Sequence, residues 1–433
     1  MNRHTGKVVW THEAELSFPV VSLSGDRIYV FDGALENFYT DWKRRGKIPK
    51  AMDDRYVKAI DVKTGKELWK HRTDVVGTWL SYSEKNDVML ITNRNSISAF
   101  RGKDGSELWK KYAVGEGFKG HPENLWDKII VLGDQIIDQQ GPGKAYDLET
   151  GESIIRTNPI TGKPIPWEFT KSGHHCSYAI ASPHLMTFRA AAAGFCDIDS
   201  ANTSRLEGFR SGCRNSLIPA NGVLNSPNMA HGCSCGYSLF TSLALTHVPE
   251  SEVWSYSALA VDAKVDQVQK LGVNLGAPGD RQDEDGTLWL DYPSVGGSSP
   301  VVSVKLTGEK VSYFNKHSAF VEQGDKRWVA ASGVEGASSL TVALSSDPTH
   351  KQVYTVRLHF MEPDDMQTEQ RVFDVSLQGK SVIKNLDITK QAKGSNHAIV
   401  HEFKGIQATT SLKIDLIAIT GRTLLSGVEI VAE

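Results

Sequence analysis

The sequence predicts an all-β protein in two parts: an incomplete β-propeller over residues 1–250 and a β-sandwich over residues 270–433. Two observations predict this fold class. A glycine turn followed by a tryptophan recurs along the first part, and a period of roughly 40 to 50 residues with strand-like segments is typical of propeller blades. Along the second part, apolar and polar side chains alternate, as in half-buried strands. The polar residues 251–269 are predicted to connect the two parts.

The recurring segment has the sequence of a β-hairpin. Its fullest copy, AIDVKTGKELW, ends at Trp69, and a second copy ends at Trp109. A third copy covers residues 145–154 without the tryptophan, and the chain opens on a partial copy at residues 5–10. We predict that Trp69 and Trp109 occupy equivalent positions between neighbouring blades.

The turn residues explain the hairpin. Gly65, Gly105 and Gly151 follow one another at spacings of 40 and 46 residues. Glycine adopts positive φ at low cost, which tight turns require. Asp61 and Asp147 can accept hydrogen bonds from the amides of their own turns. The repeat therefore specifies one supersecondary unit.

The first part offers about five blades and a fragment. The segments that could each form a blade are residues 17–69, 75–109, 118–155, 175–211 and 216–248. Because the first turn, at Thr5 and Gly6, follows Met1 so closely, we expect an incomplete ring. Blades from the same gene or from another chain would complete it, since open strand edges invite pairing. We favour a truncated gene as the explanation.

Composition excludes several classes of protein. The 433 residues carry a net charge of −3 with 23% charged residues, so there is no basic footprint for nucleic acid. No apolar run reaches the roughly 20 residues that a membrane-spanning helix needs. The N-terminus does not have the sequence of a signal peptide.

The five cysteines lie between residues 176 and 235. Cys196 is in an apolar strand and is predicted to be a buried thiol. The other four are in loop-like settings, where disulfides would staple the last blades: Cys176, Cys213, Cys233 and Cys235. The alternative is a zinc site that also uses His174, His175 or His231, although Cys-x-Cys is tighter than the usual zinc spacing. Disulfides would require an oxidising compartment, so we expect the protein to be periplasmic or extracellular.

The repeat resembles the pyrroloquinoline-quinone-like repeat, the blade unit of quinoprotein dehydrogenases and of an outer-membrane assembly scaffold. The copy ending at Trp69 carries the pattern Ala-x-Asp-x-x-Thr-Gly-Lys-x-x-Trp in full, whereas the next copy has Arg101 for the Asp and Asp104 for the Thr. Residues 208–245 are similar to the closing blades of large propeller proteins of planctomycete-type bacteria. The resemblance implies a propeller, used by most members as a scaffold.

The same resemblance raises the question of a cofactor. Quinone dehydrogenases commonly carry two adjacent cysteines beside the quinone, an Asp base and a calcium site. No Cys-Cys pair occurs in this sequence. We therefore expect no cofactor, with a quinone or calcium as the alternative.

The second part contains strands at residues 353–360, 371–377, 398–403, 411–416 and 424–430. It resembles malectin-like carbohydrate-binding modules in the segments Tyr354–Pro363, Gln370–Val375 with Gln378–Gly379, and Leu425–Ile430. The resemblance implies a β-sandwich that binds carbohydrate, and we expect residues 270–433 to fold independently.

Sugar binding needs aromatic faces for C–H groups and polar side chains for hydroxyls. The candidates are Trp289, Tyr292, Tyr313 and Trp328 with Asp285 and Asp291. The alternative for each tryptophan is a core or interdomain position. The acidic run Asp280, Asp283, Glu284 and Asp285 could hold calcium, but the full calcium-loop spacing is missing and a solvated turn is favoured.

These observations predict a non-catalytic binding or scaffold protein, with no catalytic residues and no metal. The propeller would contact proteins and the sandwich would bind carbohydrate, or another protein. The alternative is the accessory C-terminal part of a larger exported enzyme, either a quinone-dependent dehydrogenase or a polysaccharide-active enzyme.

Overall fold

A computed structural model describes most of the chain. The described residues are 1–13, 20–33, 44–46, 54–75, 77, 79–92, 96–112, 129–139, 142–171, 177–212, 215–227, 241–244, 252–255, 267–295 and 299–433. In the described residues, regular secondary structure is almost entirely β-strand, as predicted. Contacts divide it into two compact units, of which the first comprises residues 1–155, 166–199 and 207–242.

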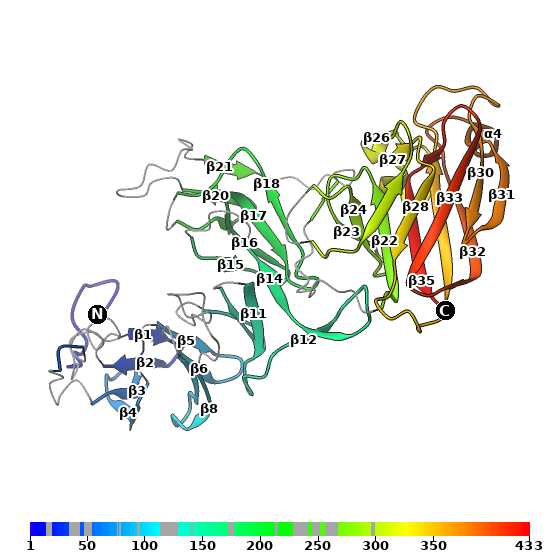
Figure 1. The fold of residues 1–433 in the computed structure, drawn as a ribbon. Helices are drawn as coiled ribbons and strands as arrows, with labels where there is room; N and C mark the ends of the chain where they lie inside the picture. Colours follow the sequence, from blue (N-terminus) through cyan, green and yellow to red (C-terminus); the bar gives the residue numbers. More distant parts are fainter. Residues whose placement is uncertain are drawn as a thin grey trace. The chain divides into compact units, whose positions relative to one another are not determined.

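The first unit consists of consecutive antiparallel sheets in the segments predicted as blades, except that the third sheet extends to residue 170 and not to the predicted residue 155 (Figure 1). The first blade is β1 (Val20–Leu23), β2 (Arg27–Asp32), β3 (Tyr56–Asp61) and β4 (Glu67–Arg72); the second is β5 (Trp79–Ser83), β6 (Val88–Thr92), β7 (Ser96–Arg101) and β8 (Glu107–Tyr112). The third is β9 (Ile129–Leu132), β10 (Gln135–Asp138), β11 (Pro142–Asp147) and β14 (Glu168–Thr170). The strands β15 (Ile180–Ala181), β16 (Leu185–Ala190) and β17 (Ala192–Asp197) follow, and then β19 (Ile218–Ala220), β20 (Val223–Ser226) and β21 (Thr241–Ala244). The strand β18 (Thr203–Leu206) is grouped with the second unit.

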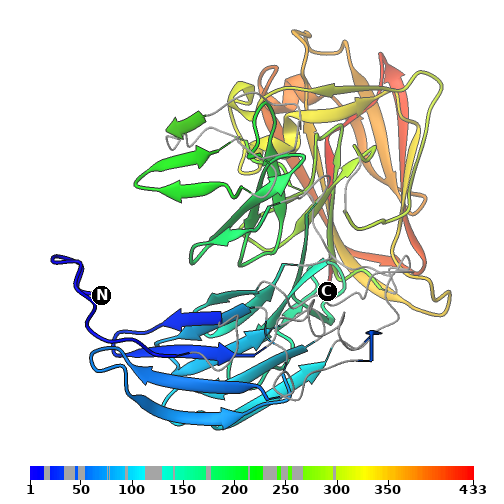
Figure 2. The same cartoon turned by 90° about the vertical axis from the view of Figure 1, so that its left-hand side faces the viewer.

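The blades are arranged around their first strands. Contacts join β1 to β5, β5 to β9, and β9 to β15 (Figure 2). Alternate residues of neighbouring blades form shared apolar clusters, such as Tyr29 and Phe31 of the first blade with Met89 and Ile91 of the second. This packing of sheet against sheet buries the faces that a single blade would leave in water.

The repeat tryptophans occupy equivalent positions, which confirms the prediction for Trp69 and Trp109. The indole Nε1 of Trp69 donates to the carbonyl of Gly102 at 3.1 Å, and that of Trp109 to the carbonyl of Leu148 at 3.0 Å. In both cases the acceptor directly follows the first residue of the next blade's turn. A β-carbon placed on Gly105 would lie 2.7 Å from the Trp69 ring, so the ring packs flat on the turn.

Two further tryptophans make the same contact. Trp10 donates to the carbonyl of Val62 at 3.0 Å and Trp167 to that of Ile198 at 2.8 Å. Trp167 is the tryptophan that the third repeat lacks in sequence. It is displaced along the chain because the hairpin of β12 (Ile155–Thr157) and β13 (Pro164–Pro166) is inserted between the paired strands β11 and β14.

The second unit is a β-sandwich over residues 243–433, to which residues 156–165 and 200–206 also belong. One sheet has the strand order β23-β24-β22-β35-β29-β32, another has β25-β28-β33-β30-β31, and β26, β27 and β34 form a third. Their bounds are β22 Lys270–Leu275, β23 Arg281–Gln282, β24 Leu288–Tyr292, β25 Val304–Thr307, β26 Ser312–Asn315, β27 Ser332–Glu335, β28 Ser339–Ala343, β29 Gln352–Met361, β30 Val372–Leu377, β31 Lys380–Leu386, β32 Ala398–Ala408, β33 Ser411–Thr420, β34 Leu424–Leu425 and β35 Gly427–Ala432.

The sandwich core lies between the two large sheets. Alternate residues of each strand point inward, as in β33, where Leu412, Ile414 and Leu416 are buried and Lys413 is exposed. The helices are short: η1 (Ser318–Phe320), α3 (Arg327–Ala330) and α4 (Ile388–Ala392). In the described part of the chain, no helix has the length and apolar character to span a membrane.

Candidate functional site

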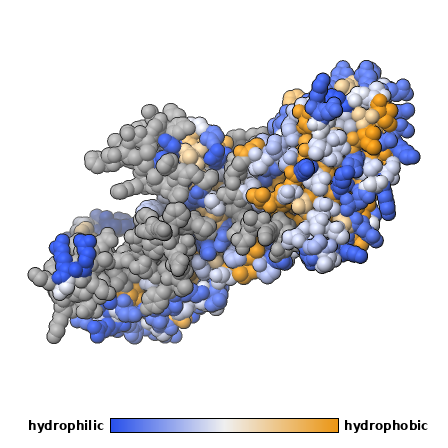
Figure 3. Space-filling view, in the orientation of Figure 1, coloured by the Kyte–Doolittle hydropathy of each residue, from blue (hydrophilic) through white to orange (hydrophobic). Residues whose placement is uncertain are grey.

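A cavity of about 360 Å³ lies at the end of β24 in the sandwich. Its walls include the valines Val273, Val302 and Val304, and its polar lining includes Asp291 and Tyr292. Val295 and Val301 nearby are 58% and 72% exposed, so apolar side chains also reach solvent in this region. Figure 3 shows that such apolar residues are interspersed with hydrophilic ones on the visible face of the sandwich.

Asp291 supplies the carboxylate of this cavity. It is 7% exposed, and its Oδ2 accepts a hydrogen bond from the backbone N–H of Val295 at 2.8 Å. Its own backbone N–H donates to Oδ1 of Asp280 at 3.3 Å. Burial raises the pKa of the Asp291 carboxyl. The side chain is therefore fixed by the loop that follows β24, with one oxygen held by the backbone.

Two of the predicted aromatic residues lie near each other at this end. Tyr292 is half-buried and lines the cavity, whereas Tyr313 in β26 is 42% exposed. Burial raises the pKa of Tyr313, and the phenol of Tyr292 raises it further. Gly276 connects their strands, because its N–H donates to the carbonyl of Tyr292 at 2.7 Å and its carbonyl accepts from Asn315 Nδ2 at 3.1 Å.

The other three predicted residues form a separate group. Trp289 is fully buried against Gly272, where an added β-carbon would lie 2.1 Å from its ring. Trp328 of α3 is half-buried and meets Trp289 edge to face at 5.6 Å. Asp285 is exposed and pairs with Lys326 at 3.3 Å. Trp289 therefore matches the core alternative, since a buried ring offers no face to a sugar.

Two members of the acidic run at residues 280–285, Asp283 and Asp285, pair with Lys326. Lys326 Nζ lies 2.5 Å from Asp283 and 3.3 Å from Glu429. Burial opposes ionisation of Asp283, but the hydrogen bonds from Lys326 and from Trp289 Nε1 lower its pKa overall. Among the described residues, no group of three His, Cys, Asp or Glu side chains is placed to hold a metal ion.

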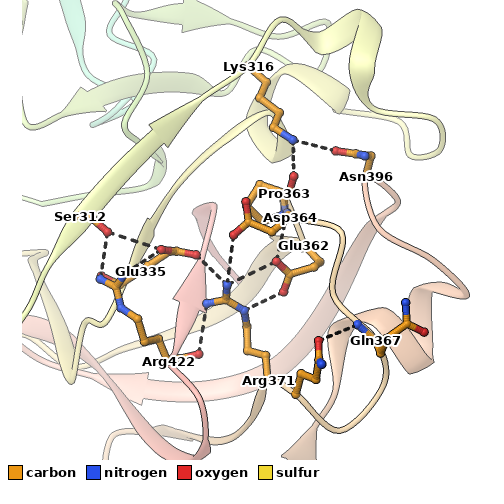
Figure 4. Close-up of polar contacts among 11 residues, drawn as sticks. Ser312, Lys316, Glu335, Glu362, Pro363, Asp364, Gln367, Arg371, Asn396 and Arg422 are labelled. Carbon is orange, nitrogen blue, oxygen red and sulfur yellow. Dashed lines mark hydrogen bonds and ion pairs between the residues drawn. The ribbon is translucent and has the colours of Figure 1, made fainter.

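Sequence reasoning missed a buried charge network beside Tyr313. Arg371 donates to Glu362 at 2.6 Å and to Glu335 at 2.7 Å, and Arg422 pairs with Glu335 at 2.8 Å (Figure 4). Arg422 also donates to Ser312, the neighbour of Tyr313 in β26, at 2.9 Å. Burial raises the pKa of Glu362, while Arg371 acts to lower it.

This network holds several segments of the sandwich together. It joins the segment after β29 to β27 and to the turn before β34, and Lys316 extends it by donating to the carbonyl of Pro363 and to Asn396. Its members are far apart in the sequence, so only the charged residue types could have indicated it.

The disulfide candidates Cys176, Cys213, Cys233 and Cys235 lie outside the described residues, as do the zinc alternatives His174, His175 and His231. The disulfide therefore stays a prediction. Cys196 in β17 is a buried thiol, which confirms that expectation.

Two family models match the chain, one in each of its two predicted parts. Residues 1–165 match the family described as outer membrane protein assembly factor BamB, and residues 272–431 match the malectin domain. A curated relative, subunit 1 of the cytochrome c methanol dehydrogenase of Methylobacterium organophilum, is 27% identical over 167 residues. That alignment covers 30% of this chain and 25% of the relative, so the chain spans a quarter of the relative's length.

Solved structures with similar regions include a β-glucuronidase of Bacteroides uniformis, at 14% identity and a TM-score of 0.30 over 38% of this chain and 18% of that chain. The ANX2 ectodomain of Arabidopsis thaliana is similar at 16% identity and a TM-score of 0.29 over 37% of this chain and 49% of that chain. The two family matches show that the chain is similar to pyrroloquinoline-quinone-like repeat proteins over residues 1–165 and to the malectin domain over residues 272–431.

Proposed function

We propose that this is a non-catalytic binding protein whose sandwich holds carbohydrate beside Tyr313, Tyr292 and Asp291. One observation carries the proposal: a half-buried tyrosine and a fixed carboxylate line a cavity at the end of β24, and Gly276 links this end to β26, which bears the exposed Tyr313. The proposed site uses three of the six residues predicted from sequence, and the malectin match supports a carbohydrate ligand.

The chemistry of these groups suits a sugar. The face of Tyr313 can pack against the C–H groups of a pyranose ring. The Asp291 carboxylate can accept hydrogen bonds from sugar hydroxyls with its remaining lone pairs, and the Tyr292 hydroxyl can donate or accept. The valine walls of the cavity would favour an apolar substituent of the ligand over a charged one.

The repeat region would serve as a scaffold for protein contacts, in line with its match to an assembly factor of the outer membrane. That match and the malectin match support a periplasmic or extracellular location. The second candidate function, the accessory part of a larger exported enzyme, is favoured by the similarity to a quarter of a methanol dehydrogenase subunit. We propose no bound cofactor for this chain.

The test is a glycan array with the full-length chain, followed by titration of each glycan that binds. Tyr313→Ala should weaken binding about five- to thirty-fold, as expected for loss of an aromatic contact of about 1–2 kcal/mol. The control is Trp79→Ala in β5, an aromatic residue of matched exposure, 41% against 42%, in the repeat region. Equal affinity of the Tyr313 variant and the unaltered chain would refute the site.

A thermal-shift measurement distinguishes the second candidate function. Stabilisation of the full-length chain by pyrroloquinoline quinone with calcium, and by no glycan, would favour the enzyme-associated function. A shift with glycan alone would favour the binding protein.

A further inference from the structure

The inserted hairpin between β11 and β14 ends in a turn of the repeat type. Asn158 Oδ1 accepts hydrogen bonds from the N–H groups of Ile160 at 2.9 Å and Thr161 at 3.2 Å. The N–H of Gly162 donates to the Asn158 carbonyl at 2.8 Å, and Gly162 has φ of 70°. The turn at Asp61 is built in the same way, with Gly65 at φ of 71° and its N–H on the Asp61 carbonyl at 2.9 Å.

The two kinds of turn differ at the third residue. In the repeat turns this position carries a charged, exposed side chain: Lys63, Lys103 or Glu149. In the inserted turn it is Ile160, which is 0% exposed and belongs to the main hydrophobic core of the sandwich. The third turn position, which is exposed in the repeat turns, is therefore a core position of the second unit in the inserted turn.

Backbone hydrogen bonds hold the turn to the first strand of the sandwich. The carbonyl of Ile160 accepts from the N–H of Gln269 at 2.7 Å and from that of Lys270 at 3.1 Å. The adjacent Val268 is fully buried and donates to the carbonyl of Leu344 at 2.7 Å. Ile165, on the returning strand of the hairpin, packs against the same core.

We propose that the sandwich has a socket, formed by Val268, Leu344 and the backbone of Gln269 and Lys270, that recognises a polar β-turn with one branched apolar residue at its tip. Its occupant is the hairpin of residues 156–165 of the same chain, which acts as a built-in plug. The sandwich core is therefore incomplete without this segment. The malectin match begins at residue 272, and the expectation that residues 270–433 fold independently omits the plug.

The test is hydrogen exchange of the full-length chain, read at the amides of Gln269 and Lys270. Ile160→Asp should expel the tip, because a carboxylate is not tolerated in an apolar core, and exchange at both amides should become at least about ten-fold faster. The matched control is Lys103→Asp, which changes the same position of an exposed repeat turn and should leave both amides unchanged. Ile160→Ala, which keeps the turn and shortens only the side chain, should give an intermediate effect.

A peptide then tests recognition directly. A cyclised peptide of residues 155–166 added to the Ile160→Asp chain should restore protection at both amides, and the same peptide with Asp at the tip should not. Unchanged exchange in Ile160→Asp, or failure of the native peptide to restore protection, would overturn the socket. Protection that rises with the concentration of the unaltered chain would show that a second copy supplies the hairpin, which overturns the assignment to the same chain.

Discussion

The contact between tryptophan and turn predicts a specific weakness at Gly105. This residue has φ of 73°, and a β-carbon there would lie 2.7 Å from the Trp69 ring and 2.5 Å from His71. Gly105→Ala should therefore destabilise the repeat region for two reasons. The alanine must adopt a left-handed conformation, and the indole must move away from its place between the blades.

The magnitude follows from these two effects. Left-handed backbone costs a non-glycine residue about 1 kcal/mol. Displacing Trp69 adds the loss of its hydrogen bond to Gly102, about 1 kcal/mol, and of part of its burial, about 1–2 kcal/mol. The free energy of unfolding should fall by about 3–4 kcal/mol in total.

The control is Gly133→Ala in the turn between β9 and β10. Gly133 has φ of 60°, but no atom lies within 4 Å of an added β-carbon. This variant should lose only the conformational part, about 1 kcal/mol. Urea unfolding of both full-length variants, followed by circular dichroism, measures the difference. Equal destabilisation of the two variants would show that the ring does not pack tightly on the turn.

Three further measurements address other features. Thiol counting under denaturing conditions should find fewer than five free thiols, because we expect a disulfide among Cys176, Cys213, Cys233 and Cys235; five would exclude it. Arg371→Met should destabilise the sandwich by about 3–5 kcal/mol because it leaves Glu362 buried without its partner, whereas the control Lys413→Met should cost less than about 1 kcal/mol because it breaks a solvent-exposed pair. Equal unfolding midpoints of these two variants would contradict the role of the network. Burial lowers the pKa of His359 to about 4, so the unfolded chain binds the proton more readily and the free energy of unfolding should fall as the pH drops from about 6.5 towards 4. The unfolding midpoint of His359→Gln should fall less over that range. Identical pH profiles of the variant and the unaltered chain would show that His359 does not cause the pH dependence.

The repeat could be recognised from sequence because each copy carries its own turn and most copies carry the tryptophan. The same local signal failed in two places. Trp167 was not recognised because the inserted hairpin displaces it from the spacing of the repeat. The fourth turn has Ala201 at φ of 56° where the other turns have glycine, so the pattern is lost although the backbone conformation is kept.

Only some residues of the candidate site could be predicted from the sequence, and Trp289 shows the reason. In β24 the side chains of Leu288 and Leu290 enter the core between the sheets, while Trp289 lies on the opposite face. That face is also covered, since Trp328 of α3 meets its ring and Val329 lies over Gly427. A strand buried on both faces shows no alternation, so its aromatic residue cannot be distinguished from an exposed one. Tyr313 could be exposed because β26 lies outside the two large sheets.

The residue at the third position of the inserted turn carries information that the repeat spacing alone does not give. A turn of the sequence Asp-x-Lys-Thr-Gly specifies its own geometry through the side chain at its first residue and the glycine at its fifth, which leaves the third residue free of any local constraint. That residue is exposed in the repeat turns, so a charged side chain is expected there. An isoleucine at this position gains nothing from the turn itself. It contributes to stability only where another surface buries it, because a branched apolar side chain exposed at a loop tip forgoes roughly 1.5–3 kcal/mol of burial. Ile160 in Asn158–Lys163 therefore distinguishes, within one family of turns, the copy that packs against a partner from the copies that face water.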